Sequence, residues 1–254
     1  MKRLQILAAL PLLCASTLAL PAVAAPETMK FLGYAYDLKS GKYLYTEAYD
    51  EQVEGGHWER GSTKYYSADG KKIGEKSVDF SADPFVPVYR LDLPGVGYSE
   101  GISRVSADGI DMFKESREKG RQSATIKKSQ QMAADAGFHA FIVANMAALV
   151  AGKTVPFKFG VAGQLDSYNF RARKIGDTEF EGRPAIRLQI EPDSLLRFAV
   201  DPLVLTYDPA SKRLLEYRGV SNVINPTTGK AYNVRIVYTS KPPDDAPKNL
   251  PPLD

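Results

Sequence analysis

Few of the side chains that commonly carry out chemistry occur in this chain of 254 residues, which has two histidines and one cysteine. His57 and His139 lie far apart in the sequence, without the HxxxH or HxH spacing that brings two imidazoles to one metal ion. His139 falls in an apolar segment, where a histidine is more often a buried core residue than a ligand. We therefore predict no metal site and no cofactor.

Carboxylates are plentiful but scattered along the sequence. Asp50, Glu51, Asp92 and Glu100 are candidates for an acid–base pair of the glycosidase type, which can assemble in three dimensions without any local sign in the sequence. Solvated strand ends explain the same residues equally well. There is no Gly-x-Ser-x-Gly nucleophile motif, and no glycine-rich stretch introduces a helix in the way that phosphate-binding loops do. We assign no catalytic residue and expect that the chain is not an enzyme.

Tyrosine is concentrated in the first 100 residues. Such residues suit a sheet surface that is apolar along the ring and wet at the hydroxyl. They indicate either an aromatic groove for a ligand or partner, or ordinary packing between strands, and the propensity of tyrosine for strands favours packing. The nine residues are Tyr34, Tyr36, Tyr43, Tyr45, Tyr49, Tyr65, Tyr66, Tyr89 and Tyr98.

Residues 1–24 have the pattern of a secretory signal peptide. Two basic residues precede the apolar run 4–20, and a small-x-small site follows at 22–24. We predict cleavage after Ala24 and localisation in the periplasm. The run is shorter than the ~20 residues that span a bilayer and is broken by proline, so we expect a soluble protein rather than a membrane-spanning one. Cleavage also removes Cys14, which leaves no thiol for catalysis or disulfides.

The stretch 132–152 has apolar residues at steps of three and four, the spacing of one helical face. Alanine dominates the other face, so we predict a long helix that is covered on most sides. Asp135 is a possible N-cap of this helix, and Gly152 suits its C-terminal end.

Elsewhere, short strands alternate with turns such as Lys39-Ser40-Gly41 and Ala68-Asp69-Gly70. In the segment 185–191 apolar and polar residues alternate, as antiparallel strands with one buried face do. The sequence predicts a mainly β (α+β) fold, in which a curved antiparallel sheet or incomplete β-barrel wraps on one long central helix. We expect a single domain over 25–240 and a proline-rich flexible tail over 241–254.

Charge excludes one class of partner. The net charge is only +3, and acidic and basic residues are interspersed. No basic arm is present that would neutralise a run of phosphates, so nucleic acid is not an expected partner. The sequence leaves the oligomeric state open.

Three segments of the C-terminal third carry a family likeness. They are Val-Leu-Thr-Tyr-Asp at 204–208, Leu-Glu-Tyr-Arg-Gly-Val-Ser-Asn-Val at 215–223 and Asn-Val-Arg-Ile-Val-Tyr at 233–238. In this order they resemble the closing strands of the LolA/LolB-like lipoprotein-carrier superfamily, and those of uncharacterised exported Gram-negative proteins that share its fold. The resemblance implies a half-barrel capped by helix, with an apolar cavity for acyl chains. It does not place the carriers' functional arginine on Arg171, Arg173 or Arg187.

These observations favour a periplasmic binding or carrier protein for an apolar ligand, such as a lipid or a lipoprotein acyl chain. The same side chains that would line its cavity would otherwise fill a packed core. The alternatives are an envelope structural or interaction module, which would use the tyrosine-rich sheet or the tail, and a hydrolase with a carboxylate site. The predicted lining residues are Phe138, Phe141, Ile142, Met146 and Leu149.

Overall fold

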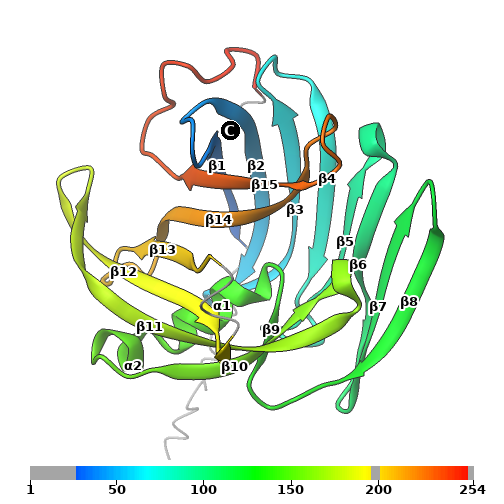
Figure 1. Cartoon of the computed structure of the whole chain (residues 1–254). Coiled ribbons are helices and arrows are strands. Elements are labelled where there is room, and N and C mark those ends of the chain that lie inside the picture. The colour runs from blue at the N-terminus through cyan, green and yellow to red at the C-terminus, as the bar shows by residue number, and fades with distance from the viewer. Residues whose placement is uncertain (1–26, 196–200, 251–254) are drawn as a thin grey trace, which may run out of the picture.

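The computed structural model of the protein describes residues 27–195 and 201–250. The strands of this part form one sheet of fifteen, in the order β8-β7-β6-β5-β4-β3-β2-β1-β15-β14-β13-β12-β11-β10-β9. Two meanders therefore meet where β1 pairs with β15, and the sheet edges are β8 and β9 (Figure 1). All pairs are antiparallel except β9 with β10.

The first meander consists of β1 (Glu27–Asp37), β2 (Tyr43–Glu54), β3 (His57–Ser67), β4 (Lys72–Asp79), β5 (Val88–Leu93), β6 (Tyr98–Val105), β7 (Gly109–Ser116) and β8 (Gly120–Lys127). The second consists of β9 (Met132–Ala134), β10 (Val155–Val161), β11 (Asp166–Phe180), β12 (Arg183–Pro192), β13 (Leu203–Tyr207), β14 (Leu214–Ile224) and β15 (Ala231–Val237). The helices α1 (Gly137–Ala144) and α2 (Met146–Val150) lie between β9 and β10.

The sheet curls around α1, so that this helix contacts both meanders (Figure 1). The ring of His139 on α1 stacks on Trp58 of β3 and on Tyr207 of β13, with centroid distances of 5.1 and 5.7 Å. On the other side of the roll, Lys114 of β7 donates a hydrogen bond of 3.0 Å to the carbonyl of Gly163, in the 3₁₀ turn η2 (Ala162–Gln164). These contacts hold strands from the two meanders face to face.

The predicted long helix over 132–152 is wrong, and the fold class built on it is therefore wrong in its central element. Residues 132–134 form β9, whose three residues are all buried. An apolar run that is buried on both faces has no strand alternation, and so it mimics part of a helical stripe. Asp135 then takes a φ of 44°, which no α-helix accommodates.

The remaining helix is interrupted at Asn145, where α1 ends and α2 begins. The Asn145 side chain donates a hydrogen bond of 2.9 Å to the carbonyl of Phe141, so it competes with the helical ladder. The result is one helix of eight residues and another of five. Neither these helices nor any other in the described residues is long and apolar enough to cross a membrane.

The turns predicted from glycine are confirmed. Lys39-Ser40-Gly41 joins β1 to β2, and Ala68-Asp69-Gly70 joins β3 to β4. Gly41 and Gly70 take φ of 71° and 78°, values that favour glycine.

The ends of the chain lie partly outside the described residues, which include neither the predicted signal peptide 1–24 nor residues 251–254. The proline-rich segment 241–250 packs on the start of the first meander. The Tyr36 hydroxyl donates a hydrogen bond of 2.9 Å to Asp245, and Ala246 is buried beside Tyr34 and Tyr43.

Candidate functional site

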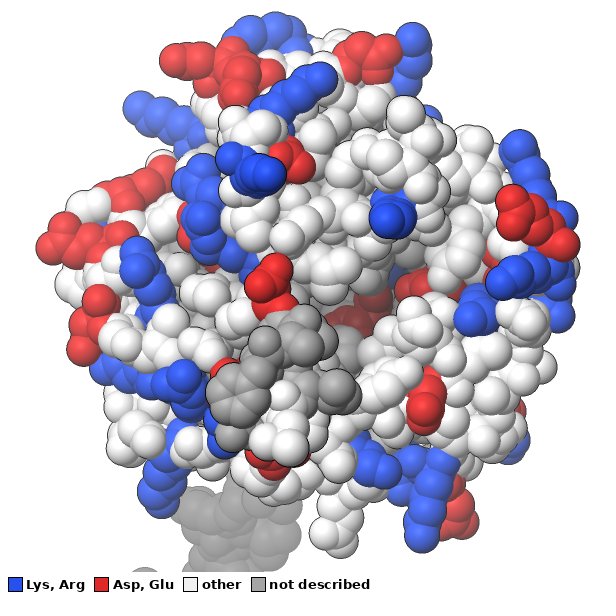
Figure 2. Space-filling model, viewed as in Figure 1, with Lys and Arg blue, Asp and Glu red and all other residues white. Residues whose placement is uncertain are grey.

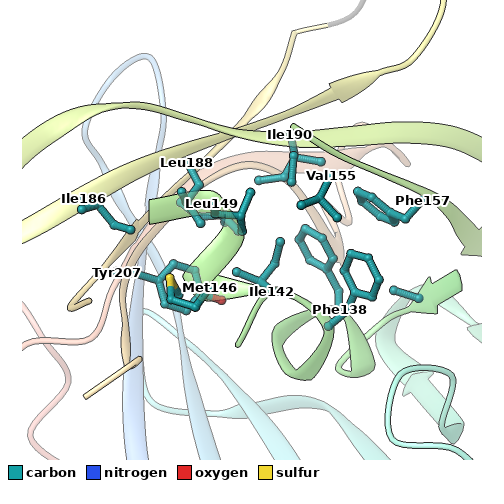
Figure 3. Close-up of a cluster of buried hydrophobic side chains, with 14 residues drawn as sticks. Phe138, Ile142, Met146, Leu149, Val155, Phe157, Ile186, Leu188, Ile190 and Tyr207 are labelled. Carbon is teal, nitrogen blue, oxygen red and sulfur yellow. The ribbon is translucent and has the colours of Figure 1, made fainter. Parts of the chain in front are cut away.

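The five residues predicted to line a ligand cavity lie in a packed apolar cluster between the helices and β10–β13 (Figure 3). All of them are buried, and Ile142 and Leu149 are completely inaccessible. Phe138 and Phe141 stack or tilt against Phe157, with centroid distances of 5.6 and 4.9 Å. Two surface hollows of about 360 and 620 Å³ are lined by other residues.

The inward face of the first meander is different, because charged residues point into it. Along β2, Tyr45, Glu47, Tyr49 and Glu51 occupy alternate positions and therefore share one face. Glu47 is 6% exposed and Glu51 only 2%. Carboxylates are almost never buried so deeply unless they are paired.

The strand register brings a lysine to the same place. Thr63 on β3 lies opposite Tyr49 on β2 and opposite Lys76 on β4, and Gly61 lies opposite Glu51. Lys76 is 8% exposed. One row of the sheet therefore carries Tyr49, Thr63 and Lys76 side by side, with Glu51 diagonal to Thr63.

Lys76 forms a buried ion pair with Asp135, in the turn between β9 and α1. Its ammonium lies 2.6 Å from the carboxylate, whose side chain is 2% exposed. Asp135 also accepts hydrogen bonds of 2.7 Å from its neighbour's backbone N–H at Ala136 and from the amide of Asn222 on β14. Asn222 is exposed, so the network reaches the surface. The positive φ of Asp135 is backbone strain of the kind that clusters at functional sites.

Two further glutamates interact with Lys76 and Asp135 through their charges, and each is hydrogen-bonded to tyrosine. Glu47 accepts a hydrogen bond of 2.6 Å from Tyr49 and one of 3.4 Å from Tyr238. Glu100 on β6 accepts one of 2.6 Å from Tyr98. Burial raises the pKa of both Glu47 and Glu100, although the tyrosine hydroxyls partly offset it.

Glu51 is the exception in this network. Its Oε2 atom is buried and has no hydrogen-bond partner among the described residues, and the same holds for Oγ1 of Thr63. Burial raises the pKa of Glu51 to about 8, and the charge of Lys76 only partly opposes this. The carboxylate occupies the space that a Cβ at position 61 would need, since its Oε2 lies 1.6 Å from that point. Gly61 therefore makes room for the Glu51 carboxylate.

The network contains more acidic than basic groups. Burial alone would lower the pKa of Lys76, but Asp135, Glu47 and Glu51 outweigh it and raise the pKa instead. These carboxyl groups, with Glu100, outnumber the two ammonium groups near them, Lys76 and, beside Glu100, Lys114. Figure 2 shows that this face of the molecule is hollowed near its middle, with Asp and Glu atoms on the floor of the hollow. Buried carboxyl groups with pKa values shifted in this way can exchange protons with a bound molecule.

Sequence reasoning identified part of this network. Glu51 and Glu100 were among the candidate acids, and both face inward. Asp50 is exposed, whereas Asp92 pairs with Arg90 through hydrogen bonds of 2.7 Å. Neither residue belongs to the network.

Glu47, Lys76, Asp135 and Asn222 were missed as functional residues. One signal was present, because Tyr-x-Glu-x-Tyr-x-Glu at 45–51 places two acids among aromatic residues on a single strand face. A glycine inside a strand, at position 61, was a second signal.

The histidines lie apart from the network's ion pair. His57 is exposed at the start of β3. Burial lowers the pKa of His139 to about 4, and its Nδ1 atom lies 2.9 Å from the Tyr207 hydroxyl. Over the residues that the structure describes, no three His, Cys, Asp or Glu side chains are grouped so as to hold a metal ion.

No protein-family model, curated protein or solved structure matches the chain. The resemblance to lipoprotein carriers therefore stays a prediction.

Proposed function

We propose that the chain is a ligand-binding protein that takes up a small polar molecule inside its first meander. One observation carries this proposal: the buried Glu51 carboxylate lies in an acidic network and lacks a hydrogen-bond donor for Oε2. A buried acceptor without a donor costs about 1–3 kcal/mol, and more when it is charged. A bound molecule that supplies the donor would offset that cost.

The polarity of the network determines what kind of ligand we propose. The apolar residues expected to line a lipid cavity pack against one another, whereas the unsatisfied groups face the interior of β2–β4. A purely structural interior would be at least as stable with apolar side chains, because buried charges are expensive to desolvate. Strongly shifted carboxylate pKa values together with backbone strain are more typical of a functional site.

For localisation we propose the periplasm, on the strength of the signal-peptide pattern in residues 1–24. The chain resembles lipoprotein carriers, and their function remains a prediction for the apolar cluster. Co-purification of a lipid would support it.

The test is to identify what co-purifies with the protein. The mature chain, beginning at Ala25, is isolated from the periplasm and denatured, and released molecules are analysed by mass spectrometry in aqueous and organic extracts. Glu51→Gln is compared with Asp50→Asn, a change to an exposed carboxylate on the same strand. We expect a polar molecule in the wild type and in Asp50→Asn, and much less of it in Glu51→Gln. Equal amounts in all three proteins, or none, would overturn the proposal. A lipid alone would favour the carrier.

A second candidate is a hydrolase, favoured by the presence of Glu51, which is protonated near neutral pH, among other carboxylates. Protonated and ionised carboxyl groups flanking a substrate are the machinery of glycoside cleavage. Turnover of chromogenic glycosides that is lost in Glu51→Gln and in Glu100→Gln, but kept in Asp50→Asn, would support it. Binding of a glycoside without turnover would contradict the hydrolase and support the binding protein.

A further inference from the structure

We infer that the group recognised inside the first meander is an organic cation, such as a primary ammonium. This inference rests on the proposed function and adds the chemical class of the ligand. It follows from the buried Glu51 oxygen that lacks a donor and from the carboxyl groups around it.

Several polar groups of the network are paired with one another. The Lys76 ammonium is bonded to Asp135, and the Asn222 amide to the second oxygen of the same carboxylate. The tyrosines donate to Glu47 and Glu100. What stays unmatched among the described residues is Oε2 of Glu51 and Oγ1 of Thr63. The Thr63 hydroxyl can donate or accept, whereas Glu51 Oε2 of the ionised carboxylate can only accept. An ammonium has three donors and no acceptor, so it can donate to both oxygens.

The charged groups of the network also favour a cation over an anion. A bound anion would disfavour the ionised forms of Glu47, Glu51 and Glu100 still further and would be repelled by those that ionise, although Lys76 and, near Glu100, Lys114 would attract it. A cation would instead stabilise the ionised form of these carboxyl groups. Because the surroundings are buried, each such interaction is stronger than it would be in water.

The hydroxyl end of Tyr65 lies among the same carboxyl groups, while its ring packs in an apolar cluster with Tyr45 and Leu91. Tyr65 is buried on β3, directly opposite Glu47 on β2. Burial raises the pKa of the Tyr65 hydroxyl, and the charges of Glu47, Asp135, Glu100 and Glu51 raise it further, which places the residue among them.

The experiment measures the thermal unfolding midpoint of the protein in the presence of an amine or of an alcohol of nearly the same shape, each at millimolar concentration. Two such amine–alcohol pairs are used. The pairs are 1,4-diaminobutane with 1,4-butanediol, and benzylamine with benzyl alcohol, so the members of a pair differ mainly in charge. We expect at least one amine to raise the midpoint of the wild type while its alcohol does not. Glu51→Gln should weaken the affinity for that amine at least 10-fold in calorimetric titration, and the same change at the exposed end of the strand, Glu54→Gln, should leave it within 2-fold.

Binding should also depend on pH. A bound cation stabilises the ionised carboxylate of Glu51. When Glu51 is protonated, binding of the cation therefore releases a proton. The groups that bear on Glu51 are Lys76 on β4, Asp50 on β2 and Asp135 before α1. The affinity for an amine that stays protonated should therefore rise between pH 6 and pH 8 in the wild type, but not in Glu51→Gln.

The possible results separate this inference from the proposed function. If an alcohol stabilises the protein as well as its amine, or if the co-purified molecule is neutral or anionic, the cation inference fails and the binding protein stands. If neither amine binds and no polar molecule co-purifies, both fail. Amine binding that is unchanged in Glu51→Gln would contradict the assigned site.

Discussion

The two meanders have similar backbones but different interiors. In each, a strand runs through a 3₁₀ turn and a left-handed residue into the next strand, at Gly97 after β5 and at Leu165 after β10. The inward face of β10–β13 is apolar, with Phe157, Leu188 and Leu205 buried against α1 and α2. The strands β2–β6 also bury apolar residues, such as Val78 and Ile102, but between them they carry the buried carboxyl groups and the lysine. Within one rolled sheet, therefore, the second meander is built for stability, and we propose that the first is built for binding.

This comparison has an energetic side. Apolar burial stabilises by roughly 25 cal/mol per Å², whereas a buried ion pair often gives no net stabilisation over apolar residues of the same size. The second meander can therefore support a first meander whose interior is costly. Substitutions in the first interior should therefore act through broken polar pairs, and those in the second through lost apolar packing.

Asp135→Ala should cause the largest loss, because it leaves the buried Lys76 ammonium and the Asn222 amide without their partner. Breaking a buried ion pair in this way costs about 3–5 kcal/mol. Urea denaturation measures the free energy of unfolding. Asp135→Asn is the matched control, since asparagine accepts hydrogen bonds and tolerates a positive φ, and it should lose less. A loss below about 1 kcal/mol in Asp135→Ala would mean that the pair is solvated.

Leu149→Ala should lower the free energy of unfolding by about 3 kcal/mol, because it opens a cavity in the apolar cluster. Ligand binding should not change. The control is Val150→Ala, next to it and 42% exposed, which should stay within about 0.5 kcal/mol. If Leu149→Ala instead altered lipid binding at little loss of stability, the cluster would be a ligand cavity, and the contrast between the meanders would be broken.

His139 should make stability fall under acid conditions. Its pKa is lowered from 6.5 to about 4, so the folded protein binds fewer protons than the unfolded chain between those values. Stability is then lost as pH falls from 6.5 towards 4, by at most ~1.4 kcal/mol per pH unit. His139→Phe should show a flatter profile in this range, and His57→Gln should follow the wild type. Parallel profiles for all three proteins would show that His139 is solvated.

Part of the fold could be predicted from the sequence. Alternation in Ile186, Leu188 and Ile190 identified a strand with one buried face, and glycine turns located hairpins. The central helix could not be predicted correctly, because Met132, Ala133 and Ala134 are buried on all sides, and neither helix nor strand spacing describes such a run.

The site was harder to predict than the fold. Lys76 and Asp135 are 59 residues apart and meet only because the sheet rolls, so no local pattern announces the pair. Glu51 looked like a solvated strand end because it follows Asp50, and only the strand register shows that it faces Gly61 inside the roll.

The central claim is that Glu51 serves binding rather than stability, and the free energy of unfolding of Glu51→Gln between pH 5 and pH 9 tests it most directly. The pKa of Glu51 is raised from 4.5 to about 8, so wild-type stability is lost as pH rises through that window, by up to ~1.4 kcal/mol per pH unit. Glutamine has no such charge. We therefore predict that the variant becomes more stable than the wild type as pH rises, with the difference levelling off above pH 8. A variant that is less stable at every pH, with no widening difference, would contradict the account and make Glu51 a structural residue.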